Sequence, residues 1–140
     1  GVSSAASDVY KRQQGEIWAK LDAGTEKYYR LIDKTTIPFQ KVLDNILITA
    51  RIRPIVVQTL FTRIDGQRIP QAEVQAYASR LQEIDELGGQ LSEIQLHTVA
   101  RKPAYPQVSA LSNSELDSIA EEIAQTLDIP LRKYYGRIEP

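Results

Sequence analysis

Cysteine is absent from this 140-residue chain, and histidine occurs only once, at His97. The chain itself therefore forms no disulfide, offers no thiolate nucleophile, and supplies no cysteine ligand to zinc or to an iron–sulfur cluster. One histidine cannot build a multi-histidine metal site. No apolar run approaches the ~20 residues that span a bilayer, and no secretory signal is visible. We therefore expect a cytoplasmic protein that makes no contact with a membrane.

Familiar catalytic motifs are also missing. The sequence has no phosphate-cradling glycine loop, no serine nucleophile elbow and no histidine-rich helix. The formal net charge of -1 provides no global field that would attract nucleic acid. Hydrophobic residues make up 42% and charged residues 25%, which is ordinary for a globular domain with a real core. Length and composition thus indicate one modest globular domain, and the motifs reveal no complete set of catalytic residues.

The first 13 residues differ from the rest of the chain. Their sequence, GVSSAASDVYKRQ, lacks apolar periodicity and resembles a translated sequencing adapter of the kind joined to environmental reading frames. We therefore predict that residues 1–13 are a non-native or disordered tail and that residues 14–140 are the folded part. The alternative is a natural tail that is disordered or weakly helical. The adapter interpretation implies that the reading frame begins within a longer protein.

After this tail, strand patterns alternate with helix patterns. Strands are predicted over residues 16–22, 55–62 and 91–99, and helices over residues 25–32, 38–53, 71–87 and 112–127. Residues 130–135 fit either a short final strand or a tail. This alternation predicts an α/β fold of repeated βα units, with a parallel sheet and right-handed crossovers.

Polar residues recur on one face of these strands. Because side chains alternate along a strand, Ala19 and Leu21 point one way while the residues beside them point the other. If the aliphatic face packs on the helices, the opposite face collects Lys20, Asp22, Gln58, Gln95 and His97. A barrel lumen filled by side chains would carry branched apolar residues there. Burying unpartnered polar groups costs ~1–3 kcal/mol each, so we expect these residues to be paired or to face a ligand.

Each of these candidates has a ligand role and a structural role open to it. Asp22 can accept hydrogen bonds from a ribose diol or bind an ammonium, and His97 can shuttle a proton. Against this, Lys20 and Asp22 can simply pair with each other. Gln58 can be a satisfied core amide, and His97 a structural histidine.

Five segments together resemble a known family. They are KLDAGTEKYYRLID from Lys20, IPFQKVLDNI from Ile37, VVQTLF from Val56, IQLHTVARKPAYPQV from Ile94 and LSNSELDSIAEEI from Leu111. In this order and spacing, residues 16–136 resemble the C-terminal half of a radical S-adenosylmethionine (radical SAM) protein. The branch in question comprises iron–sulfur oxidoreductases related to the tRNA wyosine-synthesis enzymes. No single motif is decisive, and the combination of KLDAGT with QLHTVAR is the most specific part.

This resemblance implies half of a partial (β/α)6 TIM-like barrel, whose fourth, fifth and sixth strands are the three predicted here. Family members hold a 4Fe-4S cluster on three cysteines, and the cluster reductively cleaves S-adenosylmethionine to a 5′-deoxyadenosyl radical. By the same resemblance, Lys20 and Asp22 contact the ribose or methionine part of the cofactor, while Gln58, Gln95 and His97 flank its adenine. RNA as a substrate is implied by the wyosine branch alone, because a pI near 5.9 and the lack of a basic stripe give it no independent support.

The chain departs from the family where the cluster chemistry begins. It has no cysteine for the cluster and lacks the glycine-rich segment that holds the methionine amine. We therefore expect a fragment of a radical SAM enzyme that is inactive alone, the intact parent being the oxidoreductase. The alternative, from another class, is a complete, small, three-layer α/β domain that binds a ligand or partner without catalysis. A half-barrel should aggregate or remain molten, whereas a complete domain should unfold cooperatively.

Overall fold

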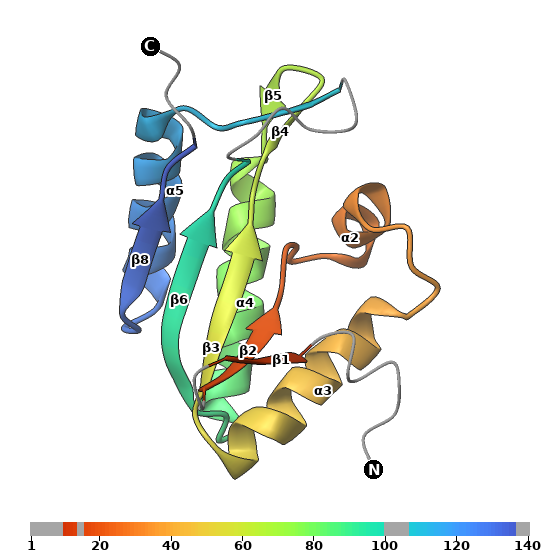
Figure 1. Ribbon diagram of the computed structural model, residues 1–140, viewed down its shortest axis with the longest axis vertical. Helices are drawn as coiled ribbons and strands as arrows, with labels where there is room; N and C mark the ends of the chain where they lie inside the picture. Colours follow the sequence, from red (N-terminus) through yellow and green to blue (C-terminus); the bar gives the residue numbers. More distant parts are fainter. Residues whose placement is uncertain (1–9, 14–15, 100–106, 137–140) are drawn as a thin grey trace.

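The larger sheet of the protein has five strands in the order β1-β2-β3-β6-β8 (Figure 1). The computed structural model describes residues 10–13, 16–99 and 107–136. Four strands run parallel: β2 (Glu16–Lys20), β3 (Ile55–Leu60), β6 (Leu91–His97) and β8 (Leu131–Tyr134). These four follow one another across the sheet in chain order. The predicted α/β fold with a parallel sheet is therefore confirmed, and residues 131–134 form a strand rather than a tail.

The helices are α2 (Glu26–Ile32), α3 (Phe39–Ile52), α4 (Gln71–Glu86) and α5 (Asn113–Thr126). Local signals in the sequence set where they begin. The Thr25 hydroxyl accepts a hydrogen bond from the Tyr28 N–H at the start of α2. Ser112 and Glu115 form a reciprocal capping box at the start of α5. Pro38 and Pro70 precede α3 and α4, at positions where a missing amide N–H leaves no hydrogen bond unmade.

The core lies on one face of this sheet. Alternate strand residues, among them Ala19, Val57 and Ile94, pack in one cluster with the buried sides of α3, α4 and α5. Helix α4 contacts both α3 and α5, so the three helices form a single layer. In Figure 1, α4 and α5 lie behind the parallel strands. Val56, which points to the opposite face, is buried but lies outside the core cluster. Within the described residues the fold thus has two layers, and the second face of the sheet has no helix over it.

A small second sheet was not predicted from the sequence. Strands β4 (Arg63–Ile64) and β5 (Gln67–Arg68) form a hairpin, and β7 (Val108–Ser109) pairs with β4 on its other side. Asp-Gly is a typical turn pair, and both Asp65 and Gly66 have positive φ, 51° and 77°. Strands of two residues are too short to show an alternating pattern, so the flanking segments look like plain loops.

Strand β1 (Tyr10–Gln13) pairs antiparallel with β2. It belongs to the 13-residue segment that was expected to be a tail, and residues 1–9 of that segment lie outside the described residues. The origin of the segment stays a prediction. Among the described helices, none combines the length and the apolar character that crossing a bilayer requires.

Candidate functional site

The five polar residues selected from the sequence lie on the sheet face opposite the core. Lys20, Gln58 and Gln95 occupy matching positions on β2, β3 and β6 and form one row across the sheet. His97 lies two residues further along β6, at the strand's carboxyl end. Asp22 follows the end of β2, on the same side as Lys20. Their gathering on one face follows directly from the twofold alternation of side chains in parallel strands.

Asp22 links β2 to β3. One carboxylate oxygen accepts a hydrogen bond of 2.8 Å from the Leu60 N–H, and the other lies 2.9 Å from the Lys20 ammonium. The Lys20 side chain is 52% exposed and that of Asp22 only 19%, so the ion pair spans the boundary between solvent and interior. Burial raises the pKa of Asp22 above its ordinary value, against the opposing effects of Lys20 and the Leu60 N–H. The structural alternative for these two residues, mutual pairing, is therefore observed, and burial outweighs the two contacts that favour the ionised form of Asp22.

The two glutamine side chains differ in their surroundings. Gln95 donates a hydrogen bond of 2.8 Å to Glu93, and the other oxygen of Glu93 pairs with Arg132 at 2.8 Å. Gln58 lies between the Lys20 and Gln95 positions, and its amide makes no hydrogen bond with the described part of the chain. Gln95 is thus held by its own strand, while Gln58 keeps a donor and an acceptor for other contacts.

His97 stacks on Tyr134 of β8, with ring centroids 4.4 Å apart and an interplanar angle of 5°. Its Nε2 atom is buried and has no hydrogen-bond partner among the described residues. Burial lowers the pKa of His97 below 6.5, so the ring is neutral at physiological pH. A neutral imidazole with one buried, unpartnered nitrogen is a group that a ligand or a further protein segment would satisfy.

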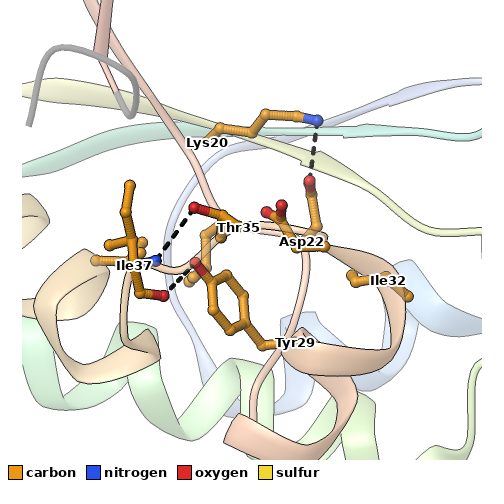
Figure 2. A pocket seen from close by; sticks show the side chains of 9 residues that line it. Lys20, Asp22, Tyr29, Ile32, Thr35 and Ile37 are labelled. Atoms are coloured by element: carbon orange, nitrogen blue, oxygen red, sulfur yellow. Dashed lines mark hydrogen bonds and ion pairs between the residues drawn. The ribbon is translucent and has the colours of Figure 1, made fainter. Parts of the chain in front are cut away.

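A pocket of about 280 Å³ lies at the carboxyl end of β2. Figure 2 shows Lys20 and Asp22 at one side of it and Tyr29 below. The opposite wall is the segment before α3, where Tyr29 Oη donates to the Ile37 carbonyl at 2.9 Å and Thr35 Oγ1 accepts from the Ile37 N–H at 3.2 Å. Gln58, Gln95 and His97 do not line this pocket. The candidate site therefore has two parts: this pocket, and the row of polar side chains on the open sheet face.

The turn after β2 is held by a residue that sequence reasoning did not select. Glu73, in the first turn of α4, accepts hydrogen bonds from the Gly24 N–H at 2.5 Å, the Thr25 N–H at 2.9 Å and the Thr25 hydroxyl at 2.7 Å. A Cβ atom on Gly24 would lie 2.1 Å from the Tyr77 backbone nitrogen, so only glycine fits against α4 there. An acidic residue in a first helical turn was visible in the sequence, but its partner 49 residues earlier was not.

The described residues contain no group of three or more histidine, cysteine or acidic side chains placed to hold a metal ion. With no cysteine in the sequence, this chain does not fit a 4Fe-4S cluster as its ligand. The polar groups on the open face do fit a hydrogen-bonding organic cofactor, because Asp22 is an acceptor in a partly buried position and His97 Nε2 lacks a partner.

Within the described residues, the fold and the site define an α/β protein whose sheet has four parallel strands, helices on one face and a row of polar side chains on the other. No protein-family model matches the chain, and no curated protein does either. The resemblance to radical SAM proteins therefore depends on the five sequence segments alone.

Proposed function

We propose that this chain is the C-terminal half of a radical SAM barrel, which supplies part of the S-adenosylmethionine pocket and the substrate-side wall. The observation that carries the proposal is the winding of the sheet. Its four parallel strands succeed one another in chain order, and the helices lie in one layer on one face.

This winding favours an arc of a barrel over the other common α/β arrangement. In a doubly wound sheet the strand order reverses at a switch point and helices cover both faces. In a (β/α) barrel each strand lies next to its predecessor and every helix lies outside. The open face of this sheet would then correspond to the lumen. Its row of Lys20, Gln58 and Gln95 gives that lumen a polar, ligand-binding character.

The position of Asp22 supports the same proposal. Barrels place their chemistry at the carboxyl ends of the strands, and Asp22 and His97 both lie at that end. The Asp22 carboxylate can accept hydrogen bonds from cofactor hydroxyls, and neutral His97 can accept one at Nε2. Bound S-adenosylmethionine and a reduced cluster would supply reductive cleavage of the cofactor. The cluster ligands would come from another part of the intact parent, so the chain alone is expected to be inactive.

A second candidate function is a small ligand-binding α/β domain without catalysis. The pocket of about 280 Å³ beside Asp22 favours it, because that volume suits a small organic molecule. The three-layer form of this alternative differs from the two layers seen in the described residues. Its ligand would occupy the edge of β2 rather than the whole polar face.

The experiment that tests the proposal is recovery of the nucleotide sequence upstream of codon 14, from a related assembly or by amplification. A continuing frame with a strand and a Cys-x3-Cys-x2-Cys loop is the expected result. A start codon with a ribosome-binding site just upstream would refute it and leave the ligand-binding domain. As a second test, a strictly monomeric state of the full chain at moderate concentration would count against a half-barrel, because a half-barrel leaves sheet edges unpaired.

A further inference from the structure

Glu73 is a buried carboxylate that reaches from α4 to the turn after β2. Its residue is 6% exposed, and it makes three hydrogen bonds, all to Gly24 and Thr25. No basic side chain of the described residues forms an ion pair with it. Burying a carboxylate is costly unless every lone pair is used, and here the donors come entirely from one turn. All the hydrogen bonds of the Glu73 carboxylate therefore stabilise the turn between β2 and α2.

That turn carries Asp22. At the start of the turn, the Asp22 carboxylate accepts a hydrogen bond from the Leu60 N–H of β3. At its end, the N–H groups of Gly24 and Thr25 donate to Glu73 of α4. Between them Ala23 is fully buried. The turn is thus fastened at both ends to neighbouring elements, and the Asp22 side chain has little freedom to move out toward solvent.

Simpler roles account for only part of this arrangement. An acidic residue in the first turn of α4 interacts favourably with the helix dipole wherever its side chain points. The Thr25 hydroxyl caps α2 through the Tyr28 N–H whether or not Glu73 is present. Neither role needs two backbone amides of the turn to converge on one carboxylate.

We propose that Glu73 is a positioning residue, which holds the turn so that the Asp22 carboxylate stays in its partly buried place at the end of β2. The inference rests on the proposed function, since it takes Asp22 as a site residue. It is tested on the chain itself, without a ligand. Its failure would therefore be separate from the discovery of a start codon upstream, which would overturn the radical SAM proposal and leave the turn unchanged.

The readout is the titration of Asp22, followed by NMR of the side-chain carboxyl carbon in the full chain and assigned with Asp22→Asn. In the unmodified protein we expect a pKa above the ordinary 3.8, because burial is the largest influence on this group. In Glu73→Gln the carboxylate is replaced by a neutral amide, whose NH₂ group cannot accept the hydrogen bonds that Gly24 and Thr25 donate. Asp22 then becomes more hydrated, and its pKa should move back toward 3.8.

The matched control is Glu115→Gln, which removes another carboxylate from the first turn of a helix. Glu115 pairs with Arg63 and caps α5, and neither residue is among the partners of Asp22, so this variant should lower stability and leave the Asp22 titration unchanged. If Glu73→Gln also loses stability but titrates Asp22 as the unmodified protein does, Glu73 is structural and the proposal is overturned.

A milder variant covers the case in which Glu73→Gln does not fold. Thr25→Ala removes one of the three hydrogen bonds to Glu73, together with the cap on the Tyr28 N–H, and keeps the Glu73 carboxylate. A smaller movement of the Asp22 pKa in the same direction supports the positioning role. An unchanged Asp22 pKa in Thr25→Ala, with Glu73→Gln unfolded, would overturn it.

Discussion

Substituting Gly24 by alanine should be among the most damaging single changes in this chain. Gly24 lacks a positive φ, so backbone conformation alone predicts a neutral or slightly stabilising effect, about 0.4–1 kcal/mol, through the unfolded state. The contact with α4 reverses that sign. The added Cβ would lie 2.1 Å from Tyr77 N, 2.5 Å from Ala76 C and 2.6 Å from Tyr77 Cα, all of them backbone atoms of a helix.

The size of the effect follows from the movement that the new atom requires. Bringing the shortest of these contacts from 2.1 Å to an ordinary 3.4 Å needs a separation of 3.4 − 2.1, about 1.3 Å, between the turn and α4. Added to hydrogen bonds of 2.5–2.9 Å, this displacement takes the Glu73 contacts beyond hydrogen-bonding distance. Hydrogen bonds to a charged group contribute about 1.5–3 kcal/mol each and are not additive. We therefore expect Gly24→Ala to lose roughly 3–5 kcal/mol of unfolding free energy.

The assay is urea unfolding of the full chain, followed by circular dichroism and by the fluorescence of Trp18, the only tryptophan. Gly66→Ala is the matched control, since a Cβ there meets nothing within 4 Å and costs only the strain of its φ of 77°, about 1–2 kcal/mol. The double variant with Glu73→Ala should cost little more than either single change, because both break the same contact. A loss below about 1 kcal/mol for Gly24→Ala would refute the reasoning.

Three further substitutions test the charges and hydroxyls around the site. Because burial raises the pKa of Asp22, ionisation of this group above about pH 3.8 lowers the stability of the folded state. Asp22→Asn should therefore match or exceed the unmodified protein in urea unfolding near pH 7 and lose that advantage near pH 3. Asp22→Ala should cost about 1–3 kcal/mol, because it leaves the Leu60 N–H of β3 without an acceptor. The hydrogen bond from Arg63 lowers the pKa of Glu115 to about 2, so the stabilisation from this pair is complete above about pH 4.5 and is lost as the pH falls toward 2. Glu115→Gln should therefore cost about 1 kcal/mol at neutral pH and less near pH 2, and an equal cost at both pH values would contradict this. The buried hydroxyls of Tyr77 and Thr59 lie 2.6 Å apart, so Tyr77→Phe alone should cost about 1–3 kcal/mol and Thr59→Val added to it should recover part of the loss, as a double-mutant cycle would show.

The parts of the fold that the sequence predicted are those set by local patterns. Alternation along residues 16–22 placed Lys20 opposite Ala19, and the structure agrees. The capping box at Ser112 and the prolines before α3 and α4 located helix starts to within a residue or two. These signals depend on neighbours within one turn of helix or two residues of strand, so no knowledge of the distant chain is needed.

The parts that could not be predicted depend on contacts between distant segments. No local pattern predicts the strand order, which depends on how β2, β3, β6 and β8 pair with one another. The Glu73 contact joins residues 48 and 49 positions apart, and nothing near either end announces it. A glycine at position 24 indicates a turn from the sequence alone, whereas the stronger constraint on Gly24 is the close approach of α4.

The same distinction separates the candidate site residues. Lys20 with Asp22 and Gln95 with Glu93 are pairs two residues apart on one side of the sheet, and the Leu60 N–H and Arg132 add contacts to them from the neighbouring strands. Pairs with such partners stabilise a polar face without needing a ligand. Gln58 and His97 have no such neighbour: the Gln58 amide and His97 Nε2 lack hydrogen-bond partners in the described part of the chain. A molecule or segment that covers the open face must therefore satisfy these two groups first, and their substitution is the sharper probe of a lumen-side ligand than substitution of Lys20.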